Sequence, residues 1–434
     1  MVFPVLTIVV TQLAGVELAG MFSLAFVTGS LLMILANYGV RTYQISDLDE
    51  AHSFSDYQLN RWLTCAAMLV VGWIYCSIRG YAGEMFTISM GVYVYKMVDG
   101  LADVYEGRLQ QKDKLYLAGI SQAFRSVLAL VVFSVVLFIT RSVSVSCIAM
   151  AIAAGVSFIV LTLPLAIWET PTSARASFDS VVALFKQCAP LFVALFLYSL
   201  IDNMPKFVME GVLSYDNQLY YNVLYFPAMG ILLTAQLIYK PMLVKMAAVW
   251  ADPEKRKRFD MIIVVIVAVI VGITVVMALI MGWIGITVMS FLYGVNFEQF
   301  RGLVFIMLAA GGVTACIDFL YQVVTVLRQQ RTVTKLYLIT FGFSLFVPIL
   351  LVNFTGLPGA VIGYLIVMCI LLVLLVWEYG KVRMALAERD KQAAAAHATR
   401  VVGRVVSTED ASAERERRSR DASAELRTSR TPRR

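Results

Sequence analysis

Four charged residues interrupt an otherwise apolar segment near residue 100. They are Lys96, Asp99, Asp103 and Glu106, and their spacing of three, four and three residues places them on one face of a helix. Charges are costly in hydrocarbon, so this face must look toward water or protein. The available chemistry is electrostatic, because a lysine attracts an anion and a carboxylate binds a proton or a sodium ion.

A second segment repeats this arrangement. Asp202, Lys206 and Glu210 are spaced by four residues, and Pro205 weakens the helix between them. Three further charged residues lie in other apolar segments: Arg125, Lys240 and Asp318. At a rise of about 1.5 Å per residue, the residues closest to the middle of their segments are Lys96, Arg125, Asp202 and Lys206.

Two interpretations of these charges are open. In the first, Lys96 with Asp99 and Asp202 with Lys206 are ion pairs within a helix that stabilise the fold. In the second they line a hydrated cavity, whose anion-binding cations are Lys96, Arg125, Lys206 and Lys240, and whose ion-coupling candidates are Asp99, Asp103, Asp202, Glu210 and Asp318. Arg125 and Lys240 have no obvious partner on their own helices, which favours the cavity.

The composition indicates an all-α polytopic membrane protein. Hydrophobic residues make up 60% of the 434-residue chain, charged residues 15%, and the mean hydropathy is +0.78. The six cysteines form no CxxC pair, only two histidines are present, and no nucleotide-binding P-loop motif occurs. We therefore expect no metal, no cofactor, no built-in ATPase and no catalytic residues.

Apolar runs bounded by charges and turn residues predict eleven complete spans. They cover residues 16–39, 62–79, 84–106, 116–140, 143–168, 189–213, 219–246, 260–284, 301–327, 335–354 and 357–379. The first twelve residues are apolar but too short to cross a bilayer of about 30 Å. We interpret them as a fragment of an incomplete first span.

A short motif occurs twice along the chain. Asp99 precedes Gln110 and Gln111 as Asp318 precedes Gln329 and Gln330, and each copy continues into Lys-Leu-Tyr-Leu, at 114–117 and 335–338. The copies lie six spans apart, which predicts two six-helix lobes in a parallel pseudo-twofold repeat. We expect an N-terminal lobe at 1–168, a linker at 169–188, a C-terminal lobe at 189–380 and a disordered basic tail at 381–434.

The short connections predict the orientation. One side carries three basic residues, Arg79, Arg141 and Arg301. The other side carries fifteen: Arg41, Arg61, Arg108, Lys112, Lys114, Arg175, Lys186, Lys245, Lys255, Arg256, Lys257, Arg258, Arg328, Arg331 and Lys335. The excess of positive charge predicts that this side and the C-terminal tail are cytoplasmic. The tail mixes both charges, which favours contact with membrane lipid over nucleic acid.

Three stretches resemble the Wzx-type polysaccharide flippases of the multidrug/oligosaccharidyl-lipid/polysaccharide exporter (MOP) superfamily. They are Asn37-Tyr38-Gly39-Val40-Arg41-Thr42-Tyr43-Gln44-Ile45-Ser46-Asp47, then Lys96, Asp99 and Asp103 with Leu109-Gln110, and Asp202-Asn203-Met204-Pro205-Lys206-Phe207. The resemblance implies two lobes around a cation-lined cavity. It also implies alternating access that moves an undecaprenyl-diphosphate-linked oligosaccharide between leaflets of a bacterial cell membrane, with a proton or sodium as coupling ion and polysaccharide-assembly proteins as partners.

The sequence therefore predicts a flippase for surface polysaccharide biosynthesis. One alternative is an ion-coupled multidrug exporter of the same superfamily, for which a more acidic and aromatic cavity is expected. The other is a membrane glycosyltransferase or polysaccharide polymerase subunit. The short connections on the non-cytoplasmic side argue against it, because they gather no cluster of His, Asp or Glu.

Overall fold

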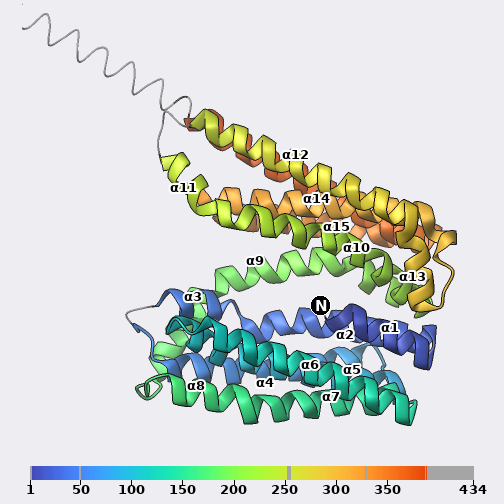
Figure 1. Cartoon of the computed structure of the whole chain (residues 1–434). Coiled ribbons are helices and arrows are strands. Elements are labelled where there is room, and N and C mark those ends of the chain that lie inside the picture. Colours follow the sequence, from blue (N-terminus) through green and yellow to red (C-terminus); the bar gives the residue numbers. More distant parts are fainter. Residues whose placement is uncertain (1, 48–49, 252–255, 328–329, 387, 389–434) are drawn as a thin grey trace, which may run out of the picture. The chain divides into compact units, whose positions relative to one another are not determined.

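The computed structural model describes residues 2–47, 50–251, 256–327, 330–386 and 388, and over these residues the chain is helical without strands (Figure 1). Residues Met1–Leu375 form one compact unit, and Val376–Arg434 form another. Gln329 and the tail from residue 389 lie outside the described residues, so the predictions made for them stay predictions.

The helices follow one another through short connections. The first half contains α1 (Val2–Ala14), α2 (Val16–Asn37), α3 (Val40–Ser46), α4 (Phe54–Ile78), α5 (Gly83–Gln111), α6 (Leu115–Thr140), α7 (Val143–Ser157), the π-helix η1 (Phe158–Thr162) and α8 (Leu163–Glu169). The second half contains α9 (Phe178–Glu210), α10 (Asp216–Tyr239), η2 (Lys240–Met242), α11 (Leu243–Ala251), α12 (Arg256–Ile280), η4 (Met281–Gly285), α13 (Ile286–Tyr293), η5 (Phe297–Phe300), α14 (Arg301–Val326), α15 (Gln330–Thr355) and a last helix, Leu357–Leu386.

Ten helical segments of the described chain are long and apolar enough to cross a membrane. They correspond to ten of the eleven predicted spans, so the predicted all-α polytopic fold is confirmed. The remaining predicted span, 84–106, is the 29-residue helix α5. It is long enough, but its charged residues lower its apolar character.

Several helices begin before the predicted spans. α9 starts at Phe178, inside the predicted linker 169–188, and α4 starts at Phe54 instead of residue 62. The first turns of α4 are held by a capping box, in which Ser53 and Asp56 each accept a backbone N–H of the other. Predictions based on apolar runs miss these amphipathic turns because their outer faces are polar.

The turn between α2 and α3 depends on two residues in the left-handed region. Tyr38 and Gly39 have φ values of 47° and 69°, and a side chain is disfavoured at such angles. Gly39 also lies against the side chain of Leu191, so a Cβ there would come within 3.1 Å of it. The turn thus places α3 beside the first half of α9.

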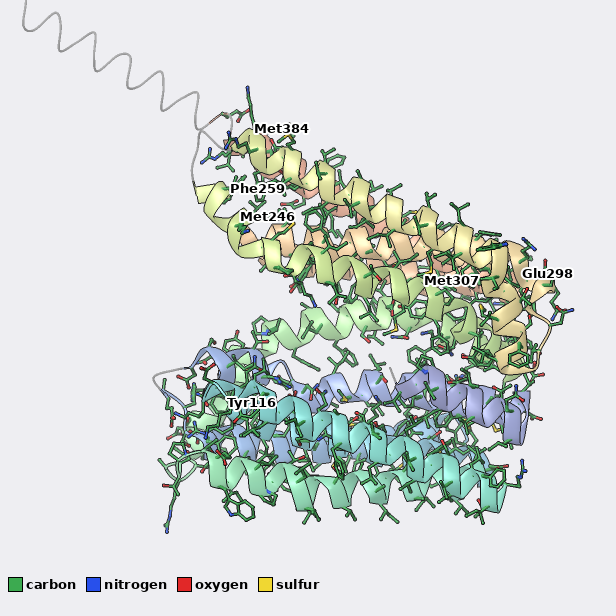
Figure 2. The ribbon with its side chains drawn as sticks, viewed as in Figure 1. Tyr116, Met246, Phe259, Glu298, Met307 and Met384 are labelled. Carbon is green, nitrogen blue, oxygen red and sulfur yellow. The ribbon has the colours of Figure 1, made fainter. Side chains whose placement is uncertain are left out.

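α5 is the central helix of the first half. It packs against α2, α4, α6 and α7, while α10 packs against α14 and α9 against α15. On their outer faces the helices carry large exposed side chains. Tyr116 at the start of α6, for example, is 65% exposed (Figure 2). This distribution suits a bundle surrounded by lipid.

The lobe boundaries predicted from the repeat stay a prediction. Two of the repeated residues have distinct surroundings, since Asp99 faces Arg125, whereas Asp318 accepts from Gln236 and Tyr239. The copies of the motif therefore share spacing without sharing partners.

The contact between α2 and the connection before α10 generates a stability prediction. A Cβ on Gly20 would lie 2.0 Å from the backbone oxygen of Tyr215, whereas a Cβ on Gly119 would meet nothing within 4 Å. We expect Gly20→Ala to lower the free energy of unfolding by about 1–3 kcal/mol, because backbone must move to admit the methyl group. Gly119→Ala is the matched control, since alanine favours a helix by up to about 1 kcal/mol. Thermal unfolding in detergent measures both, and equal midpoints would contradict the close approach.

Candidate functional site

A cavity of about 470 Å³ lies among α1, α2, α5, α6, α9 and α10. Four of the predicted site residues line it together: Lys96, Asp99, Asp202 and Lys206. The rest of its wall combines neutral polar and aromatic side chains, among them Ser30, Gln122, Ser126, Asn203, Asn222, Phe3, Phe26, Tyr95, Tyr225 and Phe226. The cavity thus joins the two charged segments that the sequence analysis singled out, one from each half of the chain.

Both lysines of the cavity lack an ion pair among the described residues. The Lys206 ammonium donates to Asn203 Oδ1 at 2.9 Å and lies 4.6 Å from the ring centre of Tyr225. Lys96 lies 4.2 Å from the ring centre of Phe26. Aromatic faces attract cations by about 0.5–2 kcal/mol, which offsets part of the desolvation cost but leaves both lysines without a close counterion.

Arg125 was predicted to be one of the cavity cations, but it is not among the residues that line the cavity. Its guanidinium is buried and binds Asp99 at 2.9 Å and Glu106 at 2.8 Å, with Thr162 Oγ1 at 3.4 Å. Its partners come from the neighbouring helix α5, and its role as a cavity cation stays a prediction. It contacts two α5 carboxylates, and Asp99 forms its close ion pair with Arg125 rather than with Lys96.

Asp202 is held by hydroxyl groups. Tyr364 donates to its carboxylate at 2.7 Å, and the Tyr225 hydroxyl lies 3.3 Å from both oxygens. Within the described chain it has no basic partner within 4.0 Å, although Lys206 is one helical turn away. The interpretation of Asp202 and Lys206 as a neutralising pair thus finds no contact to support it.

Asp103 lies apart from the cavity, at the end of the bundle that carries most of the basic connections, here termed the basic end. It binds Arg41 at 2.5 Å and Arg61 at 2.9 Å. Arg61 is wholly buried and also donates a hydrogen bond, at 3.0 Å, to the carbonyl oxygen of Ala36 near the end of α2. The span boundaries predict Arg61 in a connection, but it lies in the second turn of α4 and joins α2, α4 and α5.

Glu210 also lies outside the cavity lining, at the opposite end of the bundle. Its side chain is 2% exposed and accepts from Arg79 at 2.7 Å, from Tyr75 at 2.7 Å and from Tyr81. Because these donors come from α4 and the connection after it, Glu210 fastens the end of α9 to α4. These contacts are structural, and the ion coupling predicted for Glu210 stays a prediction.

Asp318 and Lys240 belong to a third polar group. Lys240 donates to Gln236 Oε1 at 2.9 Å, Gln236 donates to Asp318 at 2.9 Å, and Tyr239 donates to the same carboxylate. Asp318 lines a smaller pocket of about 160 Å³ with Tyr198, Tyr321 and Tyr337. The structure does not bring these two predicted site residues into the cavity of Lys96 and Lys206.

The glutamine pair that ends α5 holds a connection in place. Gln110 accepts from Arg41 at 3.0 Å, and Gln111 donates to the Asp47 carbonyl at 2.5 Å. Nearby, Lys112 and Arg108 donate to Glu50 and thereby lower the pKa of its carboxyl group. These contacts give Gln110 and Gln111 a structural role.

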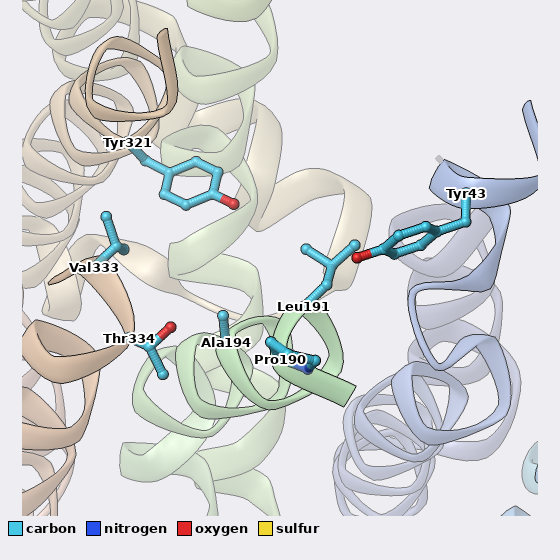
Figure 3. A pocket seen from close by; sticks show the side chains of 7 residues that line it. All are labelled: Tyr43, Pro190, Leu191, Ala194, Tyr321, Val333 and Thr334. Atoms are coloured by element: carbon cyan, nitrogen blue, oxygen red, sulfur yellow. The ribbon is translucent and has the colours of Figure 1, made fainter. Parts of the chain in front are cut away.

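A second pocket of about 200 Å³ lies near the basic end (Figure 3). Tyr43 of α3 faces Leu191 of α9 on one side, and Tyr321 of α14 lies on the other with Val333 and Thr334 of α15. Charged side chains are absent from its described lining, so it is a poor candidate for an anion site.

The sequence analysis missed the neutral residues of the cavity wall. Asn203 was named only as part of a family-like stretch and Asn222 not at all, although an amide in an apolar segment needs a polar neighbour. The position of Asn203, three residues before Lys206, was the available signal. Aromatic residues such as Tyr225 gave no such signal in the sequence, since aromatic residues are common throughout apolar helices.

Comparison with known proteins shows the fold. No protein-family model and no curated protein matches the chain. Among solved structures, the lipid II flippase MurJ in an inward closed conformation aligns with a TM-score of 0.68 at 10% identity, covering 87% of this chain and 85% of that one. An inward-facing multidrug resistance MATE family transporter of the MOP superfamily aligns with a TM-score of 0.61 at 12% identity, covering 89% and 95%.

A third similar structure is a MOP superfamily transporter from Pyrococcus furiosus, described as having a binding pocket of reverse polarity. It aligns with a TM-score of 0.51 at 15% identity, covering 88% of this chain and 91% of that one. The chain therefore has the fold of MOP superfamily transporters.

The buried Arg125 network generates a second prediction. Arg125→Met leaves two carboxylates without their cation, and we expect a loss of about 3–5 kcal/mol in the free energy of unfolding. Replacing Glu106 by leucine in the same chain should recover part of this loss. Lys240→Met is the control, because this exposed lysine makes one hydrogen bond, to Gln236, and surface changes usually stay within about 0.5 kcal/mol. Thermal unfolding in detergent would contradict the assignment if Arg125→Met were as stable as Lys240→Met.

Proposed function

We propose that this protein is a transporter that moves a polyprenyl-diphosphate-linked oligosaccharide across the cell membrane by alternating access. The observation that carries the proposal is the pair of lysines in the cavity, whose potential carboxylate partners bind other groups. Asp99 is engaged by Arg125, and Asp202 by two tyrosines.

The electrostatics of the cavity favour an anionic ligand. Lys206 is 3% exposed and has no ion pair in the described chain, and keeping a buried cation unpaired is costly. A diphosphate brought between Lys96 and Lys206 supplies the missing charge, and the lysines in turn replace the water that a diphosphate loses on leaving the aqueous phase. The cost of moving the head group through the membrane is thereby lowered.

The neutral part of the wall suits the sugar that follows the diphosphate. Amide and hydroxyl groups of Gln122, Ser126, Asn203 and Asn222 donate and accept hydrogen bonds without adding charge. A volume of about 470 Å³ is in the range of small-molecule sites, so the cavity accommodates the head of the lipid rather than a whole polysaccharide.

The fold supports a transport mechanism without covalent chemistry. Structures with the same fold include the lipid II flippase MurJ and MATE transporters. We propose that the protein acts in a bacterial cell membrane with its basic end in the cytoplasm. Coupling to a proton or sodium ion fits best at Asp202, because this cavity carboxylate is held by tyrosines and forms no ion pair within 4.0 Å among the described residues.

A multidrug exporter is the second candidate. Its specific support is the aromatic wall of Phe26, Tyr95 and Tyr225 together with Asp202, which would suit a cationic drug. The two lysines oppose this assignment, because each would repel such a ligand.

Substitution of the cavity lysines tests the proposal. Charged hydrogen bonds contribute about 1.5–3 kcal/mol, so Lys96→Ala and Lys206→Ala should each reduce transport by about 10–100-fold. The measurement is the accumulation of lipid-linked sugar in the cytoplasmic leaflet and the loss of surface polysaccharide in cells that depend on the protein. Lys240→Ala, outside this cavity, should leave both unchanged. Normal surface polysaccharide with altered drug tolerance in the Lys206 variant would instead favour the exporter.

A further inference from the structure

Helices α2 and α9 each line two different spaces. Toward the cavity, α2 presents Ser30 and α9 presents Lys206. Toward a separate groove, α2 presents Leu31 and α9 presents Leu200. The two helices pack against each other, so their seam separates a polar space from an apolar one.

The groove is an apolar channel of about 300 Å³ among α2, α4 and α9. Its wall consists mainly of aliphatic and phenyl side chains, namely Leu31, Leu32, Val71, Phe196, Leu200 and Phe207. From Phe196 to Phe207 the helix rises by about 16 Å, which is enough to cover the first few isoprene units of a polyprenyl chain. Val71 is 42% exposed, so the groove is open to surrounding lipid on this side.

One end of the groove is polar but electrically neutral. Arg79 and Glu210 both line it and form an ion pair at 2.7 Å, to which Tyr75 adds a hydrogen bond. The groove therefore offers a hydrocarbon chain no uncompensated charge, whereas the cavity across the seam offers two unpaired lysines. This contrast is complementary to an amphiphile with an anionic head and an apolar tail.

We propose that this groove binds the polyprenyl chain of the lipid whose diphosphate occupies the cavity, so that the substrate straddles the seam between α2 and α9. The proposal rests on the proposed function and adds the path of the tail to it. Helices α2 and α9 then act as the lateral gate through which the lipid enters from the membrane. Ion pairing of Glu210 with Arg79 ties α9 to α4 and keeps the groove together at the end opposite the basic end.

Two adjacent valines of α4 provide a matched test. Val70 and Val71 are both exposed to lipid, at 56% and 42%, but only Val71 belongs to the groove lining. Val71→Trp fills the groove and should lower transport of a long-chain polyprenyl-diphosphate sugar by about tenfold or more in proteoliposomes. A lipid with the same head group and a single isoprene unit should be transported by this variant as by the wild type. Val70→Trp should leave transport of both lipids at the wild-type rate.

A labelling experiment on the unmodified chain does not depend on the variants folding. A photoreactive polyprenyl diphosphate should label the peptides containing residues 196–207 and 71 more strongly than photoreactive phosphatidylglycerol at the same concentration. Equal labelling by both lipids would show an ordinary phospholipid site and overturn the proposal, as would equal effects of the two tryptophan substitutions. If the wild-type protein moves neither lipid-linked sugar, the proposed function itself fails, and this result is distinct from either of the others.

Discussion

The candidate site depends on the contact of Arg125 with Asp99 and Glu106. One buried guanidinium binds two carboxylates of α5, at 2.9 and 2.8 Å. Without it, the nearest available counterion of Lys96 would be Asp99, one helical turn away, and the cavity would hold a closed ion pair instead of a free cation. The absence of a close ion pair at Lys96 thus originates in a residue that does not line the cavity.

The same division of roles extends along α5. Its charged face is distributed among three surroundings: Lys96 and Asp99 reach the cavity, Glu106 binds Arg125, and Asp103 binds Arg41 and Arg61 at the basic end. Asp99, Asp103 and Glu106 therefore each contact a cation from another helix, which fixes α5 against α3, α4 and α6. A helix with so many charges is stable at this depth because its neighbours satisfy them.

The sequence predicted the helical class and most of the spans, because apolar runs of about twenty residues are a strong signal. It also identified Lys96, Asp99, Asp202 and Lys206, since charged residues in such runs are rare. It could not separate these four from Arg125 and Glu210, because depth along a helix does not reveal which neighbouring helix supplies a partner. The environments of Asp99 and Asp318 illustrate the same limit. The two residues have equivalent positions in the repeat, but Asp99 contacts an arginine, whereas Asp318 contacts Tyr239 and Gln236.

A lipid with a charged head poses opposite requirements for its two ends, and a single space cannot meet both. Burial of a diphosphate needs cations and polar groups, while an isoprenoid chain gains nothing by leaving hydrocarbon. A single layer formed by α2 and α9 resolves this, because successive residues on a helix point in different directions and can face a different space on each side of the layer. Ser30 and Leu31 are neighbours in α2, yet one lines the polar cavity and the other the apolar groove. The separation of head and tail then follows from helical geometry, and the substrate can pass between α2 and α9 without either end entering an unsuitable environment.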